Sequence, residues 1–530
     1  MDIGTLSLLL LLAMLALLAI GMPLGFASGF LAVFVLVLRF GPDILFREFG
    51  TGPLNILAQR IYGLTTDYVI ISVPLFIFMA SLLERSGIAK DMYSSLNIWL
   101  SRTRGGIAIV TAIMAIIMAA MSGIIGGEVV LLGLIALPQM LRLGYSRNLA
   151  VGTICASGSL GTMIPPSIVL IIYGLVTETS IKSLFTAAFL PGFMLASFFI
   201  IYIIIRTRLR PEDAPLPEPK DSDPTTREKF ILFGGLLMMT IGPAAALLLA
   251  RAVLIHVMGQ AVLEEGDDPI RLISPDAMMW LGGAAVACVV GLFTLLSKDR
   301  RALAWAMGKG LIPPLVVIGV VLGSIYGGIT GITEAAGMGV VAVMVLTFLR
   351  GELTWTLLKE SLMRATKSTG TIIWVTFGAT ALAGAYTIAG GPTYVANLII
   401  GADLPTMGII LVMMLIFLIL GALMDWVGIV LLVMPVFLPI VTRLPVDEIG
   451  FIGLIPASFV PIWFGVLFTM NMQVSFLSPP FGPAAFYLKS VAPPEISLVD
   501  IFRGFMPFIL IQLLALSVML VWPGLTHVFF

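Results

Sequence analysis

Two long apolar stretches, each broken twice, constrain the fold more than any other feature of this sequence. The first, 121–173, is apolar enough to lie in a membrane but is interrupted at 122–127 and again at 157–166. The second, 421–488, contains MDWVGIVLLVMPVFLP and then NMQVSFLSPPFGPAAFYL. Paired interruptions in the two halves of a hydrophobic chain are a strong sequence indication of a transporter's binding site.

The apolar composition predicts an all-α polytopic membrane protein. The chain is 59% hydrophobic and only 11% charged, whereas soluble domains carry about 25% charged residues. Apolar runs such as 6–20, 107–121 and 409–423 approach the roughly 20 residues that a helix needs to cross the hydrocarbon core. A β-barrel would show ten-residue alternation instead. Because residues 1–20 lack a basic n-region and a small-x-small cleavage site, we expect them to be retained as a span.

Each half of the chain is predicted to hold a re-entrant helical hairpin followed by a discontinuous helix. The hairpins are expected at about 105–141 and 405–441, and the broken helices at about 148–175 and 458–488. Two crossing helices are the alternative for 105–141, but arms of about 17 and 15 residues with a Gly/Ser tip favour a hairpin. In the second half, we expect residues 350–367 to lie along the membrane interface and residues 368–388 to span the membrane.

The two halves also align with each other. Residues 25–41 resemble 333–351, residues 128–138 resemble 428–439, and the Pro-Pro of each broken helix falls at the same place. Most of the 29 Lys and Arg residues fall on one face of the predicted topology, which the positive-inside rule makes cytoplasmic and which puts the N-terminus in the periplasm. The halves are then inverted repeats, 1–210 and 301–530, separated by a linker and an inserted helix pair at 211–300.

The broken segments carry the expected chemistry. Unwound backbone in a membrane must face protein or a watered cavity, and its carbonyls and neighbouring hydroxyls suit a hard cation such as Na⁺, whereas helix N-termini suit an anion. The predicted cation-binding residues are Ser122, Gly123, Ser157, Gly158, Ser159, Thr162, Gly421, Asp425, Asn471, Ser475 and Ser478. The predicted substrate-binding residues are Pro165, Pro166, Ser167, Pro479 and Pro480.

Asp425 and Glu128 are the two acids within the broken segments. Charges at membrane depth are functional candidates, although either residue could simply cap the helix that follows it. An intramembrane enzyme using both acids is a further alternative, but they lie in different halves and lack a nucleophile partner. No ATP-binding loop and no metal-ligand or Ser/His/Asp pattern is found, so we expect a carrier that is not an enzyme, needs no cofactor and binds no nucleic acid.

Five segments, in this order, carry a family resemblance: SGIIGGEVVLLGLIALPQMLRLGY, SGSLGTMIPPSIVLIIYG, GITEAAGMGVV, GALMDWVGIVLLVMPVFLPI and FLSPPFGPAAFYL. The chain resembles the large membrane (permease) subunit of tripartite ATP-independent periplasmic (TRAP) transporters over nearly its whole length except 212–300. The first tip departs from the family pattern, which has more Ser and Thr and an Asp.

The resemblance implies an elevator-type secondary transporter in the bacterial inner membrane, with Na⁺ as the coupling ion and a small organic acid as the substrate. It also implies two protein partners, a periplasmic substrate-binding protein and a small four-helix membrane subunit. Because no four-span segment precedes the repeat, we expect that subunit to be a separate chain. A self-sufficient Na⁺- or H⁺-coupled dicarboxylate or anion carrier fits the inverted repeat equally well.

Overall fold

The computed structural model describes residues 2–46, 52–100, 103–123, 126–216, 225–257, 275–401, 404–422, 424–480 and 482–530. Every regular element in these ranges is a helix, as the sequence predicts. Nine of the described helices are long and apolar enough to cross a membrane, and six shorter apolar helices accompany them. Residues 124 and 125 of the first predicted tip lie outside the described ranges.

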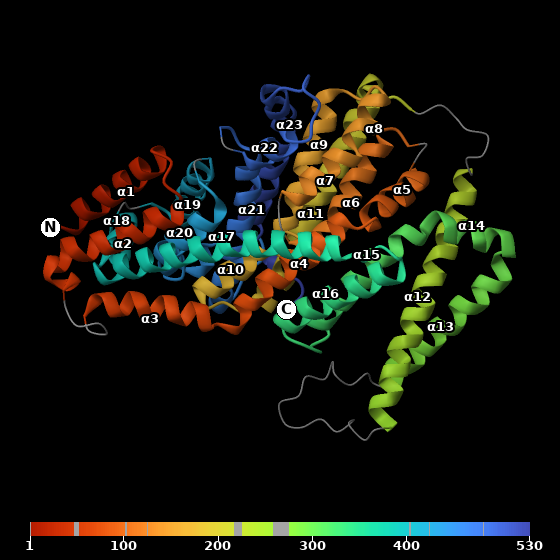
Figure 1. Cartoon of the computed structure of the whole chain (residues 1–530), viewed down its shortest axis with the longest axis horizontal. Coiled ribbons are helices and arrows are strands. Elements are labelled where there is room, and N and C mark those ends of the chain that lie inside the picture. The colour runs from red at the N-terminus through yellow and green to blue at the C-terminus, as the bar shows by residue number, and fades with distance from the viewer. Residues whose placement is uncertain are drawn as a thin grey trace.

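The first half runs from α1 to α11 (Figure 1). Its elements are α1 (Ile3–Ala19), α2 (Leu24–Phe40), α3 (Pro53–Thr66), α4 (Ser72–Arg85), α5 (Ile88–Leu100), α6 (Gly106–Ser122), α7 (Gly127–Ile135), α8 (Leu137–Arg142), α9 (Arg147–Ser159), α10 (Ile168–Thr177) and α11 (Ile181–Leu209). Helices α6 and α7 occupy the segment predicted as the first hairpin. Helices α9 and α10 occupy the segment predicted as the first broken helix.

The second half runs from α14 to α23. Its elements are α14 (Lys298–Gly308), α15 (Ile312–Tyr326), α16 (Ile332–Leu349), α17 (Trp355–Ile388), α18 (Gly391–Ile400), α19 (Thr406–Gly421), α20 (Trp426–Val441), α21 (Val460–Leu477), α22 (Pro483–Lys489) and α23 (Leu498–Val521). Helices α19 and α20 occupy the second predicted hairpin segment, and α21 and α22 the second broken one. The apolar stretch of α21 is 89% buried, which places this helix in the middle of the molecule.

The inserted pair consists of α12 (Thr226–Val257) and α13 (Pro275–Leu295), which pack on each other. The pair stands beside the rest of the chain in Figure 1. None of the 18-residue apolar window of α13 is buried. A helix that is apolar all round and uncovered by protein is suited to contact with lipid. The bilayer is therefore the natural environment of this face.

Helix α17 differs from the sequence expectation. Thr354 caps its start by accepting a hydrogen bond from the Leu357 amide at 3.1 Å, and the helix then runs without interruption for 34 residues. The predicted interfacial segment 350–367 and the predicted span 368–388 thus belong largely to one helix. The only breaker near their expected boundary is Gly370, and a single Gly is tolerated inside a helix.

The two repeats pack on each other in a reciprocal way. Helix α22, from the second broken segment, contacts α7 of the first hairpin and also α9. Helix α10, from the first broken segment, contacts α20 of the second hairpin and also α21. Each half therefore contributes a helix to the other half's hairpin, as expected of inverted repeats that meet at a shared site. The Pro165–Pro166 and Pro479–Pro480 peptide bonds, at equivalent places, are both cis.

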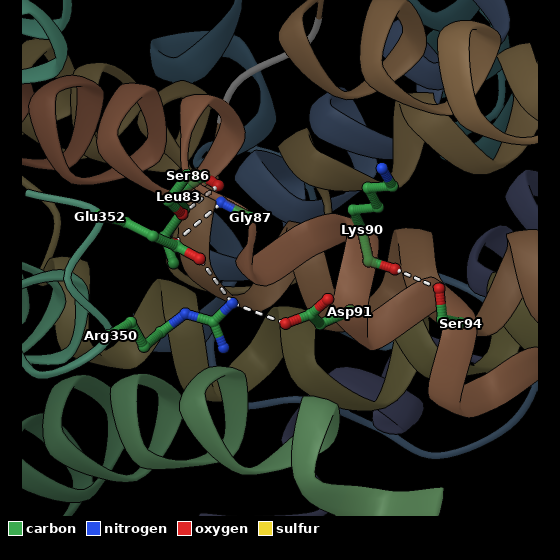
Figure 2. Close-up of polar contacts among 8 residues, drawn as sticks. All are labelled: Leu83, Ser86, Gly87, Lys90, Asp91, Ser94, Arg350 and Glu352. Carbon is green, nitrogen blue, oxygen red and sulfur yellow. Dashed lines mark hydrogen bonds and ion pairs between the residues drawn. The ribbon is translucent and has the colours of Figure 1, made fainter.

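An ion-pair cluster joins the end of α16 to the start of α5 (Figure 2). The Arg350 guanidinium donates to Asp91 at 2.6 Å and to Glu352 at 2.8 Å. Glu352 in turn accepts a hydrogen bond from the Gly87 amide at 3.1 Å. Because Arg350 is only partly exposed, these charges are screened less than a fully exposed pair. The cluster therefore fixes the turn between α4 and α5 against the second half.

Candidate functional site

The first break lies between α9 and α10. Helix α9 ends at Ser159, a short 3₁₀ turn covers Leu160–Thr162, and α10 begins at Ile168. Ser167 caps α10 by accepting a hydrogen bond from the Leu170 amide at 3.4 Å, and its hydroxyl donates to the carbonyl of Thr162. The segment is fully buried, so its polar groups must find partners within the protein or in a bound ligand.

The tip of the first hairpin closes over this break. The Ile168 amide donates to the Gly123 carbonyl at 3.3 Å. Gly123 has a φ of +63°, a conformation that suits glycine. Its α-carbon also sits so close to the Pro166 carbonyl oxygen that a Cβ would overlap that oxygen. Tip and break therefore form one packed unit.

Glu128 belongs to the same unit. It is fully buried and accepts a hydrogen bond from the Ser122 hydroxyl. Its carboxylate also lies against the break, because a Cβ at Gly161 would be 2.9 Å from Glu128 Oε1. Gly158 packs on Val129, the next residue of the same hairpin arm. The structure thus brings together the predicted residues of the first half and adds Glu128 to them.

In the second half, hairpin and broken helix meet at Gly421 and Ser475. A Cβ at Gly421 would overlap the Ser475 hydroxyl, so α19 and α21 are in direct contact there. The Ser475 hydroxyl donates to the Asn471 carbonyl at 3.4 Å. Asn471 is fully buried, and its amide group donates to the Met414 carbonyl on α19 at 3.0 Å. These three predicted residues therefore form a second buried polar group.

The remaining predicted residues of the second half are placed differently. Asp425 is the N-cap residue of α20, and its side chain is exposed, unlike that of Asn471. Ser478 is only partly buried and donates to the Val474 carbonyl at 2.8 Å. Pro479 and Pro480 are exposed, in contrast to the buried Pro-Pro of the first half. The second break is therefore the more open of the two.

Two glutamines that sequence reasoning missed join the halves. Gln473 on α21 donates to the Thr162 hydroxyl of the first break, and Gln512 on α23 donates to Ser159 Oγ at 3.5 Å. Both side chains are fully buried. The signal that could have identified them is their occurrence inside otherwise apolar spans, where polar side chains are costly and usually have a specific partner. They link the first break to α21 and α23 of the second half.

Several buried oxygen atoms of this region have no hydrogen-bond partner among the described residues. They are Thr153 Oγ1, Ser157 Oγ, Glu128 Oε2, Gln473 Oε1, Gln512 Oε1 and Asn471 Oδ1. A buried polar atom without a partner costs about 1–3 kcal/mol. Oxygen donors of this kind, including one carboxylate, are what a hard cation prefers. The donor set therefore fits a cation such as Na⁺.

Fold and site together define a polytopic membrane carrier whose two halves meet at broken helices. The chain belongs to the TRAP transporter family: residues 11–525 match the family described as "Tripartite ATP-independent periplasmic transporter, DctM component". The family resemblance and the membrane fold predicted from the sequence are thereby confirmed. Large permeases of this family work with a substrate-binding protein and a small membrane subunit.

Three relatives illustrate the similarity. The C4-dicarboxylate TRAP transporter large permease protein DctM of Pseudomonas aeruginosa is 24% identical over 491 residues, covering 92% of this chain and 90% of that protein. The ectoine permease TeaC of Halomonas elongata is 25% identical, with 96% and 95% covered. The isethionate permease DctMQ of Oleidesulfovibrio alaskensis is 22% identical, with 97% and 64% covered.

Among solved structures, MtrF of Neisseria gonorrhoeae has a similar fold. Its TM-score is 0.51 at 12% sequence identity, and the match covers 93% of this chain and 94% of that chain. At this level of identity the similarity concerns the fold alone. It agrees with the all-helical fold of the described residues.

Proposed function

We propose that this chain carries a small organic acid across the bacterial inner membrane by Na⁺-coupled secondary transport. The observation that supports this most is the group of unpartnered buried oxygens at the joined breaks. A bound Na⁺ would supply the missing partner for several of them, and it would supply positive charge beside an anionic substrate. The family to which the chain belongs is one of transporters, so transport without catalysis is the function we propose.

The substrate class follows from what the relatives' names share. C4-dicarboxylates, ectoine and isethionate are small molecules that all carry a carboxylate or a sulfonate. We therefore propose a small organic acid with at least one such group as the substrate of this chain. A periplasmic binding protein and a small four-helix membrane subunit would be its partners, and the N-terminus would face the periplasm.

Sodium coupling can be tested on Ser157. Its hydroxyl is buried and unpartnered, so Ser157→Ala should stabilise the protein slightly if the hydroxyl binds nothing. If the hydroxyl binds Na⁺, the same change should instead reduce the rise in melting temperature that Na⁺ produces, since a ligand stabilises by RT ln(1 + [L]/Kd). Ser361→Ala is the matched control, because the Ser361 hydroxyl on α17 is likewise buried and unpartnered.

The tripartite arrangement can be tested by reconstitution. Liposomes containing this chain should take up succinate, ectoine or isethionate only when a small subunit and a binding protein, encoded beside it, are added and when Na⁺ is present outside. Full uptake by this chain alone would favour the alternative, a self-sufficient Na⁺- or H⁺-coupled anion carrier. Uptake that is indifferent to both Na⁺ and pH gradients would contradict ion coupling altogether.

A further inference from the structure

A cavity of about 530 Å³ lies where the first hairpin tip and α22 face α4 and α17. None of the predicted cation-binding residues lines it. Its polar lining residues are Ser81, Glu84, Arg85, Arg364, Ser368 and Tyr487, and its apolar wall comes mainly from α7. A cavity of this size suits a small ligand. It adjoins the cation site, because Gly126 and Gly127 of the tip belong to its wall.

Two arginines line this cavity: Arg85 pairs with Glu360, whereas Arg364 pairs with Glu84 in the lining itself. Arg364 Nη1 donates to Glu84 Oε2 at 2.6 Å, and the arginine side chain is 40% exposed, against 8% for Glu84. A guanidinium has five N–H donors, so one hydrogen bond to Glu84 leaves donors for a ligand. Its planar fork matches a carboxylate or another planar oxyanion face better than a lysine would. The cavity thus offers a cation to an organic acid.

The position of Glu84 indicates what else the cavity is built to hold. Its Oε1 lies against Gly127, the first residue of α7, so closely that a Cβ at Gly127 would overlap it. The Glu84 carboxylate therefore sits between the Arg364 guanidinium and the N-terminus of a helix. Both favour an anion. The carboxylate of Glu84, which belongs to the neighbouring helix α4, thus occupies a position that suits the anionic group of a ligand.

Two further polar side chains complete the lining. Ser81 Oγ, one turn before Glu84, is buried and has no hydrogen-bond partner among the described residues. The Tyr487 ring lies against Gly126 of the tip, and this tyrosine lines the cavity from α22. Hydroxyl groups from opposite walls can thus reach the polar part of a small ligand.

We propose that this cavity binds the carboxylate or sulfonate of the transported organic acid through Arg364, and that Glu84 holds this place until the substrate displaces it. The proposal rests on the proposed function, from which it takes the substrate class. Displacement would also remove the contact between Glu84 and the N-terminus of α7. Substrate binding would thereby release the first hairpin from α4.

The test uses uptake by the reconstituted complex, with succinate, ectoine and isethionate as probes. Arg364→Gln should raise the KM of the transported probe roughly 10- to 100-fold, the range expected for losing a charge-assisted hydrogen bond. Arg364→Gln should leave unchanged the Na⁺ concentration that gives half-maximal uptake. Glu84→Gln should lower the KM, because a competing carboxylate is removed. Lys367→Gln is the matched control: this lysine is on the same helix, is exposed and does not line the cavity.

A second variant guards against misfolding. Arg364→Gln leaves the Glu84 carboxylate buried without its partner, which is destabilising. The double variant Glu84→Gln/Arg364→Gln replaces both charged side chains and so leaves no buried charge unpaired. If Arg364→Gln does not fold, the KM of the double variant tests the proposal instead, and it should be raised. An unchanged KM in these variants would overturn the inference. Inhibition of uptake by inorganic phosphate that depends on Arg364 and is as strong as inhibition by the probe would also overturn it. Failure of the wild-type complex to take up any probe would overturn the proposed substrate class as well.

Discussion

Replacing Gly123 by alanine should loosen the first hairpin from the first break. Gly123 has a φ of +63°, and a Cβ there would overlap the Pro166 carbonyl oxygen. The left-handed backbone costs a non-glycine residue about 1–2 kcal/mol. Forcing an extra carbon against backbone costs about 1–3 kcal/mol more. The expected loss of unfolding free energy is therefore about 2–5 kcal/mol.

Gly351→Ala is the matched control. Gly351 has a similar φ of +70°, but a Cβ there would meet no atom within 4 Å. It should cost only the backbone component of about 1–2 kcal/mol. The difference between the two variants isolates the contact between Gly123 and Pro166. That contact also positions the Gly123 carbonyl, which accepts the Ile168 amide at 3.3 Å.

The assay is denaturant titration of the detergent-solubilised chain, with the midpoint and slope compared between variants. Each titration is repeated with Na⁺ replaced by choline. Gly123→Ala should unfold at a lower denaturant concentration than Gly351→Ala and should respond less to Na⁺. Equal midpoints for the two variants would refute the packing argument. A lower midpoint with a full Na⁺ response would refute the link between this contact and the cation.

Three other substitutions test separate parts of the structure. Asn471→Ala should reduce the thermal stabilisation by Na⁺, because it removes a buried unpartnered oxygen and the hydrogen bond to the Met414 carbonyl; an unchanged Na⁺ response would exclude it as a ligand. Arg350→Gln should lower the unfolding free energy by about 1–3 kcal/mol through loss of its two ion pairs, and equal stability would contradict the anchoring role of this cluster. Ser497→Ala should cost about 0.5–2 kcal/mol by breaking the capping box of α23, measured by the same titration.

The sequence predicted the breaks well because their causes are local. Glycine and serine at 122–127 and Pro-Pro at the two later breaks interrupt helices through their own backbone preferences. Glu128 was identified as a candidate acid for a similar reason, since a carboxylate within an apolar run is conspicuous. Its contact with Gly161 could not be predicted in the same way.

Contacts between helices that are distant in the sequence could not be predicted, because they depend on how each helix is rotated about its own axis. Gln473 reaches Thr162, and Gln512 reaches Ser159, only because α21 and α23 present those faces to the first break. The cavity at Arg364 is another case, since its lining comes from four separate segments. The unbroken α17 was missed because its amphipathic first part resembles an interfacial helix, although no strong breaker separates it from the second part.

The length of α17 has a mechanical consequence. At 1.5 Å per residue a 34-residue helix is about 51 Å long, well above the roughly 30 Å of the hydrocarbon core. It lies along α2, α3 and α4, and a Cβ at Gly378 would overlap the Gly25 carbonyl, so it is tightly braced over much of its length (Figure 1). Such a stiff helix holds Arg364 at a fixed position relative to α2, α3 and α4. The length of α17 beyond the hydrocarbon core also means that this helix must tilt in the bilayer or extend beyond it, so it can carry Arg364 without depending on the first hairpin for its position.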